Sequence, residues 1–296
     1  MATHDLSALS TDFVGGAEVY RKQLLKWRIR EFGIQVRTNV DTPQALAKFA
    51  AAGNAQPYRK QDDFNGTVET DRILTVFMAK LDQELDPEDF RNTYLAELPD
   101  MPFNQYAIAA GGEKFIDDLM SDTLWSGVRN GAGTTAADIC DGWGTIIAAE
   151  IIAGGLTEVA TGAITAANAV TKVEDVYEAC PTWMKEKEEG IVVYCSYNIL
   201  EKYKKHYRTL NAFGFKRDEK GQYALDGANA ILMPVSFMGA SQRLVATLRG
   251  NLVFGTDADG LTNHPTPHLN LLRNRIMFAS GCQIKDLDAM QVNDQA

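Results

Sequence analysis

The sequence predicts an α+β fold, because helical and strand patterns alternate along its second half. A β-branched run at Ile191–Cys195 indicates a short buried strand, and amphipathic helical patterns lie on both sides of it. Further short strands are expected at 230–235, 243–248 and 251–254, and a last one at 275–283. No internal repeat and no low-complexity segment is visible in the sequence.

The two helices beside the first strand have recognisable ends. The earlier helix ends before Pro181, because proline cannot continue a helix, and the later one begins after Ser196, a residue type that caps helices. Each has one apolar face at helical spacing. The faces consist of Val170, Val173, Val176 and Tyr177 in the earlier helix, and of Leu200, Tyr203, Tyr207 and Leu210 in the later one.

A long amphipathic helix is expected at 103–127. Gly111 and Gly112 weaken its first half by roughly 1 kcal/mol each relative to alanine, and the glycine-rich segment 127–133 ends it. Its apolar residues recur at helical spacing and are Ile108, Phe115, Ile116, Leu119, Met120 and Leu124.

Two elements are expected between residues 42 and 77. An alanine-rich helix begins at Thr42–Pro43, where threonine can cap and proline fits the first turn, and it fades at Gly53. A β-hairpin follows at 58–77 around Asn65–Gly66, a dipeptide that suits a tight turn. Its arms carry too many charges to lie on the chain's own core, and an isolated hairpin is marginal in water. We therefore expect this hairpin to pack on another subunit.

The segment 1–45 contains a short basic amphipathic pattern that differs from the acidic remainder of the chain. One interpretation is the solvated face of a helix, and the other is an arm that crosses an acidic neighbouring subunit. Its apolar residues are Val19, Leu24, Leu25 and Ile29, and its basic residues are Arg21, Lys22, Lys26, Arg28 and Arg30.

Composition places the chain among ordinary folded proteins, with 296 residues, 45% hydrophobic and 23% charged. This length allows one large domain or two of ordinary size. The formal net charge of -10 argues against a protein that coats nucleic acid by neutralising phosphates. If acidic subunits lined a container, their charge would repel the phosphates of DNA inside it and let that DNA slide.

No secretory signal is visible at the amino terminus, so the protein is expected to stay where it is made. The most apolar stretch, 146–156, contains Glu150 and is shorter than the roughly 18 to 20 residues that span a bilayer. No membrane helix is therefore expected. The cysteines lack metal-site spacing, so we expect reduced and mostly buried thiols at Cys140, Cys180, Cys195 and Cys282.

Four patterns that suggest chemistry have simpler interpretations. His264 and His268 are four residues apart, but two prolines between them exclude a shared helical face, so an exposed loop is expected. The segment 257–260 lacks the ligands of an EF-hand and is expected to be a polar turn. The segment 131–135 lacks the lysine of a P-loop. Tyrosines and lysines at 203–208 could bind nucleic acid, but their helical spacing favours core tyrosines and a solvated basic face.

No active site is expected. The isolated His206 lies in no recognisable nucleophile motif, and no triad, carboxylate pair or cofactor fingerprint is present. The sequence therefore predicts no catalytic, cofactor-binding or metal-binding residue, and no cofactor.

From about Asp138 onward, the order of these elements resembles the major capsid proteins of tailed phages with the Hong Kong 97-like fold. The unit Ile191–Leu210 is similar to that family's strand followed by a helix, and Asn251–Asp257 is similar to its Asn-Leu-Val-x-Gly-Thr-Asp phrase. Arg275–Ile284 resembles its final strand, and Asp141–Trp143 resembles the entry to its axial domain. The amino-terminal half resembles the family only in layout.

The resemblance implies an α+β subunit with five parts. These are an amino-terminal arm (1–45), an extended hairpin loop (46–80), a peripheral domain with a spine helix (81–140), an axial domain (141–265) and a return strand to the peripheral domain (266–296). The family's best-known member begins with a long coiled-coil scaffolding segment, which this sequence lacks, so a separate scaffolding protein is left open. No residue pair for a covalent subunit cross-link can be aligned.

The function that the resemblance implies is self-assembly. Hexamers and pentamers would form the icosahedral head shell around double-stranded DNA, without sequence-specific contact, in a virion assembled in the host cytoplasm. Expected partners are further copies of the chain, a scaffolding protein, a portal and a decoration protein, with no membrane. Two alternatives stay open: an encapsulin-like shell that encloses cargo enzymes, and an unrelated α+β enzyme.

Overall fold

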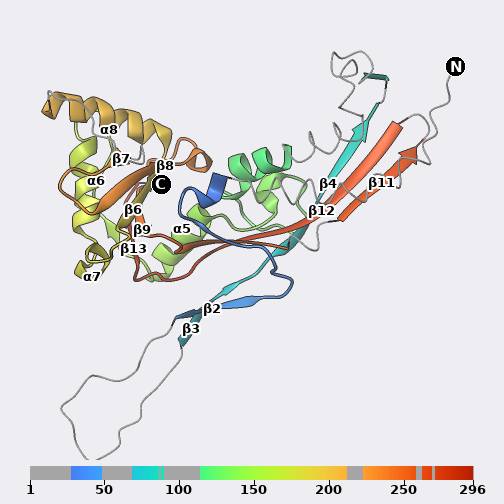
Figure 1. The fold of residues 1–296 in the computed structure, drawn as a ribbon, viewed down its shortest axis with the longest axis horizontal. Helices are drawn as coiled ribbons and strands as arrows, with labels where there is room; N and C mark the ends of the chain where they lie inside the picture. The colour runs from blue at the N-terminus through green and yellow to red at the C-terminus, as the bar shows by residue number, and fades with distance from the viewer. Residues whose placement is uncertain are drawn as a thin grey trace, which may run out of the picture.

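The computed structural model describes residues 28–48, 69–86, 88–89, 114–211, 223–257, 262–268 and 271–295. Figure 1 shows a body that contains a small sheet with helices, a long narrow sheet that extends from this body, and a stalk of two strands that projects in another direction. The carboxyl terminus lies within the body. The predicted α+β class is confirmed.

The body is built on a six-stranded sheet whose central strand is apolar on both faces. All five residues of β6 are buried, because helices cover one face and a second apolar cluster covers the other. β6 pairs in parallel with β8 and antiparallel with β9. The strand order is β5 (Glu158–Val159), β13 (Met290–Asn293), β9 (Val245–Leu248), β6 (Ile191–Cys195), β8 (Ala230–Pro234) and β7 (Tyr223–Ala224).

The two predicted helices beside β6 are confirmed, and they pack on one face of this sheet (Figure 1). Ser196 caps α8 (Tyr197–Leu210), because its Oγ accepts a hydrogen bond from the Ile199 backbone N–H at 3.5 Å. α6 (Ala169–Glu178) ends before Pro181 as predicted, and the short α7 (Thr182–Lys185) follows.

The long sheet is organised around β12 (Leu271–Ile284), a single strand of 14 residues. On one edge β12 pairs with β4 (Phe77–Leu85). On the other edge it pairs first with β11 (Thr262–His268) and then with β10 (Leu252–Thr256), which also pairs in parallel with β1 (Gln35–Arg37). β12 therefore holds this sheet together along its whole length.

One apolar cluster joins the two sheets. Trp143 and Ile147 of α5 (Trp143–Ala153) pack there with Tyr194 of β6 and Phe254 of β10, and all four side chains are buried. Short 3-10 helices flank the cluster at η2 (Arg28–Arg30), η5 (Ala136–Asp138) and η6 (Ser236–Met238). Burial of large apolar side chains is the main stabilising term in such a core.

The predicted helix at 103–127 is confirmed where it is described. Residues 114–118 are α-helical and continue into a π-helix, η4 (Leu119–Thr123). Phe115, Leu119 and Leu124 are buried in the cluster that joins the sheets, which confirms the expected apolar face. The helix ends before Gly127, as predicted, and residues 103–113 lie outside the described part.

The alanine-rich segment after Thr42–Pro43 is a strand, so the helix predicted there is wrong. β2 (Gln44–Lys48) pairs antiparallel with β3 (Glu69–Leu74), and this pair forms the stalk in Figure 1. Burial of Leu46 against Leu74 favours the strand pairing and overrides the local helix propensity of alanine.

The hairpin predicted at 58–77 lies outside the described residues up to residue 68. Its described part, β3, pairs with β2, which lies about twenty residues earlier in the chain. The turn at Asn65–Gly66 itself lies outside the described residues.

His264 and His268 lie on β11, so the loop predicted there is also wrong. β11 pairs only with β12 among the described strands, which makes it an edge strand. Pro265 and Pro267 have the same parity on the strand, so both missing N–H groups fall on one side, the unpaired edge. An edge strand can therefore contain two prolines, which a central strand of a sheet would not tolerate.

The sheets do not follow the predicted boundary between residues 265 and 266. β10 belongs to the long sheet, and β13 returns to the six-stranded sheet. Asn251 holds the two crossing segments together: its Nδ2 donates to the Asp286 carbonyl oxygen, and its Oδ1 accepts from the Asp286 N–H, both at 2.8 Å. Asn251 is buried, which makes these hydrogen bonds costly to lose.

Two glycines allow the stalk to cross the long sheet. Gly255 of β10 and Gly281 of β12 are paired in register. A Cβ atom on Gly281 would overlap the backbone carbonyl oxygen of Thr75, and one on Gly255 would lie 2.9 Å from Leu74 Cδ2. Residues 74–76, which join β3 to β4, therefore lie directly against these glycines.

Gly281→Ala is expected to lower the free energy of unfolding by about 1–3 kcal/mol, because the backbone at Thr75 must move away from the added methyl group. Urea unfolding of the purified chain measures this change. Gly131→Ala is the matched control, because a Cβ atom there meets nothing closer than Arg129 Nη2 at 3.8 Å. Equal stability of the two variants would contradict the close crossing.

Candidate functional site

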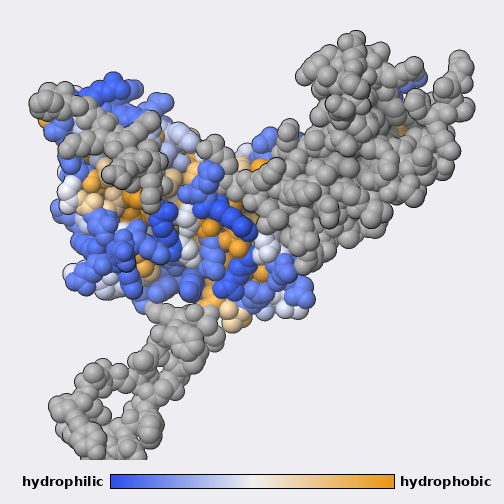
Figure 2. Space-filling model, in the orientation of Figure 1, coloured by the Kyte–Doolittle hydropathy of each residue, from blue (hydrophilic) through white to orange (hydrophobic). Residues whose placement is uncertain are grey.

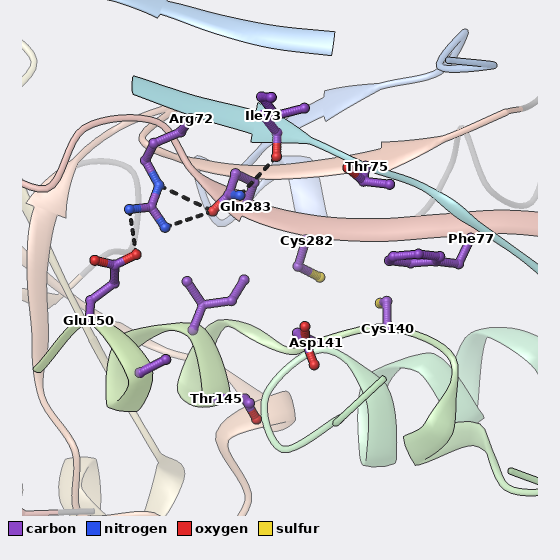
Figure 3. A pocket seen from close by; sticks show the side chains of 12 residues that line it. Arg72, Ile73, Thr75, Phe77, Cys140, Asp141, Thr145, Glu150, Cys282 and Gln283 are labelled. Carbon is purple, nitrogen blue, oxygen red and sulfur yellow. Dashed lines mark hydrogen bonds and ion pairs between the residues drawn. The ribbon is translucent and has the colours of Figure 1, made fainter. Parts of the chain in front are cut away.

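A cavity of about 380 Å³ lies where the stalk meets the body. Its walls come from the β3–β4 junction, from α5 and the segment before it, and from the end of β12 (Figure 3). The lining residues are Arg72, Ile73, Thr75, Phe77, Cys140, Asp141, Thr145, Ile146, Ala149, Glu150, Cys282 and Gln283. Three segments that are distant in sequence therefore meet at this point.

Arg72 ties the stalk to the body. Its Nη1 lies 2.7 Å from Glu150 Oε1 on α5, and its Nε and Nη2 donate to Gln283 Oε1 on β12 at 3.2 and 2.9 Å (Figure 3). The Arg72 side chain is 11% exposed and that of Glu150 is 25% exposed. A planar guanidinium that binds two partners at once fixes direction as well as distance.

Gln283 is the residue through which three elements meet. Its side-chain amide donates to the Ile73 carbonyl oxygen at 2.9 Å while its Oε1 accepts from Arg72. Its backbone carbonyl oxygen accepts a hydrogen bond from Trp143 Nε1 at 3.2 Å. The stalk, β12 and α5 therefore hold a fixed geometry around one side chain.

The stalk has little core of its own. In the described residues, its strands contribute Leu46 and Leu74 to a cluster of four buried side chains that also contains Val40, and Val253 of β10, with Val76 packed against them. Near the junction with the body, Ile73 of β3 is 55% exposed, and Met78 of β4 in the long sheet is 60% exposed. Within the described residues, the apolar surface of the stalk and its junction is only partly covered by the chain itself.

Figure 2 shows a mostly hydrophilic surface over the body, with apolar side chains gathered near the middle of the molecule. The long sheet carries exposed ion pairs between β4 and β12: Arg273–Glu84 and Arg275–Asp82, each at 2.6 Å. Hydrogen bonds from Arg275 and Lys80 lower the pKa of Asp82. Pairs this exposed add little stability, but they set which residues lie opposite each other.

The patterns that suggested chemistry are parts of the scaffold. Tyr203 and Tyr207 are buried and stacked, with ring centroids 6.2 Å apart, which confirms the expected core face of α8. His206 is also buried, and its Nδ1 accepts a hydrogen bond from the Val170 N–H at the start of α6. The segment 131–135 is a turn that precedes η5, where Asp138 and Thr135 form a capping box.

In the part of the chain that the structure describes, no three His, Cys, Asp or Glu side chains are grouped so that they could hold a metal ion. None of the described helices has the length and apolar character that crossing a bilayer requires. Asp257 forms an isolated bridge to Asn39, and 258–261 lie outside the described residues. The four cysteines are buried and free, as expected.

Sequence reasoning missed Arg72, Glu150 and Gln283. Arg72 is one of the charges of the hairpin expected at 58–77 to pack on another subunit, yet its side chain is mostly buried by the chain itself. Its partner Gln283 is 211 residues away in sequence, so no local pattern could pair them. The one available signal was Glu150, a single charge in the most apolar stretch of the chain, which indicates a specific partner.

Comparison with known proteins was informative only at the level of structure. No family model matches the sequence, and no curated protein matches it. A chain of the satellite phage P4 procapsid aligns with a TM-score of 0.58 and 13% identity, over 93% of this chain and 88% of that one. The capsid of Myoviridae phage XM1 aligns with a TM-score of 0.53 and 13% identity, over 90% of each chain.

The capsid of a native GTA particle is also similar, with a TM-score of 0.53 and 12% identity, over 90% of this chain and 88% of that one. Nearly the whole length is therefore shared with phage capsid subunits. At this identity the similarity establishes the fold: the chain has the Hong Kong 97-like fold that the sequence resemblance implied.

Arg72→Ala is expected to lower the free energy of unfolding by about 1–2 kcal/mol, since the partial exposure of Glu150 reduces the effect. Arg72→Lys should recover only part of this loss, because an ammonium group cannot bind Glu150 and Gln283 as a fork. Thermal unfolding measures both variants. Lys80→Ala, which removes a pair exposed by 62% and 45%, is the control and should cost under about 0.5 kcal/mol. A larger loss for Lys80→Ala than for Arg72→Ala would contradict the anchoring role.

Proposed function

We propose that this chain is the major capsid protein of a tailed bacteriophage or prophage, and that it acts by self-assembly and not by catalysis. Copies would form hexamers and pentamers that close into an icosahedral shell around double-stranded DNA. The observation that carries this proposal is the capsid fold over about nine tenths of the chain. The projecting stalk supports it, because its described apolar residues are only partly covered.

The parts of the subunit follow from the two sheets. The six-stranded sheet with α6 and α8 would be the axial domain, and the long sheet with the helix at 114–123 would be the peripheral domain. In this assignment β10 belongs to the peripheral domain, and β13 belongs to the axial domain. The stalk, β2 and β3, would be the base of the extended loop at 46–80, and 1–45 would be the arm.

Multivalency would give the shell its stability. Each copy contributes a stalk and an arm to its neighbours, so the second contact forms at high effective concentration after the first. A head-to-tail contact between two different surfaces closes into a ring when its rotation allows closure. The basic residues of the arm would meet an acidic neighbour, consistent with a chain whose formal net charge is -10.

Other partners follow from the same proposal. A scaffolding protein, a portal and a decoration protein would bind the shell, which would assemble in the host cytoplasm. An acidic subunit would contact packaged DNA without reading its sequence, since a negative lining repels phosphates.

Electron microscopy tests this proposal directly. The purified chain at high concentration, alone and co-expressed with a scaffolding protein, is expected to form rings or closed shells in negative stain. Shells that contain DNA would distinguish a phage head from an encapsulin-like container, which would hold a cargo enzyme instead. A chain that stays monomeric under both conditions would contradict the proposal, and a turnover abolished by one point substitution would favour an enzyme.

A further inference from the structure

Two cysteines that are far apart in sequence meet in the cavity beside the stalk. Cys140 lies in the segment before α5, and Cys282 lies on β12. Figure 3 shows both thiols pointing into the cavity, toward each other. The two side chains are near enough for Cys282 to lower the pKa of the Cys140 thiol. The other two cysteines, Cys180 and Cys195, do not line this cavity.

Both cysteines are held by well-bonded backbone. On the Cys140 side, the Gly142 N–H donates to the Gly127 carbonyl oxygen at 2.9 Å, and the Arg129 N–H donates to Asp141 Oδ1 at 2.8 Å. On the other side, Cys282 is paired with Phe254 in the β10–β12 ladder. Both cysteines therefore line the same cavity from backbone segments that hydrogen bonds hold in place.

Cys140 differs electrostatically from the other three thiols. The hydrogen bond from Cys282 lowers the pKa of Cys140, and burial opposes this effect. Burial raises the pKa of Cys282 and also that of Cys180, the latter to about 11. Because the thiolate is the reactive form, Cys140 is the more nucleophilic member of the pair.

Only small oxidants can reach the sulfur atoms of Cys140 and Cys282. Cys140 is 1% exposed and Cys282 is 7% exposed, so a bulky disulfide reagent cannot reach either sulfur easily. The cavity of about 380 Å³ has polar side chains in its lining, such as Asp141 and Thr145, and admits molecules near the size of water. Hydrogen peroxide is an oxidant of that size.

We propose that Cys140 and Cys282 form an intramolecular disulfide when the protein meets hydrogen peroxide. The Cys140 thiolate attacks one peroxide oxygen, the O–O bond breaks, and hydroxide leaves and takes up a proton to become water. The Cys282 thiol then attacks Cys140 Sγ, the S–O bond breaks, and the hydroxyl leaves as water with the thiol proton. Two thiols and one peroxide thus give one disulfide and two waters.

This disulfide would link the segment before α5 covalently to β12. Cys282 is the residue after Gly281, where the stalk crosses the long sheet. The disulfide closes a long loop, from residue 140 to residue 282, and so restricts the unfolded chain. A reducing compartment keeps the two thiols reduced, and an oxidising one favours the disulfide. The chemistry does not depend on whether the chain forms shells.

Peptide mapping of the full chain after peroxide treatment tests for the Cys140–Cys282 disulfide. The expected result is one species in which the Cys140 and Cys282 peptides are linked and two hydrogen atoms lighter, with Cys180 and Cys195 still free. Its melting temperature should rise by about 5–10 °C and return after reduction. Cys180→Ser, the matched control, should form the same link.

In Cys282→Ser, the expected product is a sulfenic acid at Cys140 that dimedone traps, because the resolving thiol is gone. Both thiols remaining alkylatable after peroxide would overturn the proposal, and so would sulfinic acid at either sulfur without a link, or a link between two chains. Should either serine variant fail to fold, the linked or unlinked peptides of the unsubstituted chain still decide the outcome.

Discussion

The fold depends on the crossing of the stalk over the carboxyl-terminal end of β12. Gly281 leaves room for the chain at Thr75, and two residues later Gln283 binds both Arg72 and the backbone of Ile73. Trp143 donates to the backbone of the same glutamine, so α5 is attached to this crossing as well. Close backbone approach and a fork of hydrogen bonds together fix the direction in which the stalk leaves the body.

This geometry separates a body with a large apolar core from a projection with a small one. Large apolar side chains join the six-stranded sheet to the long sheet, whereas the described strands of the stalk contribute two residues to a cluster of four buried side chains. A two-stranded element with so small a core gains little from its own burial. In the proposed function, contact with other copies would cover the rest of this projection.

Sequence reasoning succeeded where structure is determined locally. β6 was predicted at its observed bounds, and α8 was predicted from the Ser196 cap, because burial of successive residues and a capping hydroxyl are local signals. It failed for β2 and β11, whose strand form depends on distant partners. The Arg72–Gln283 contact was missed for the same reason, since no spacing in the sequence relates residues 211 positions apart.

The most direct test of the account is backbone hydrogen exchange at residues 69–74, measured for the free subunit and for the assembled shell. The account predicts that β3 is markedly more protected in the shell than in the free subunit, while β6 exchanges slowly in both, because β3 would gain burial from neighbours and β6 is already buried. Equal protection of β3 in the two states would contradict the claim that the projection depends on other copies.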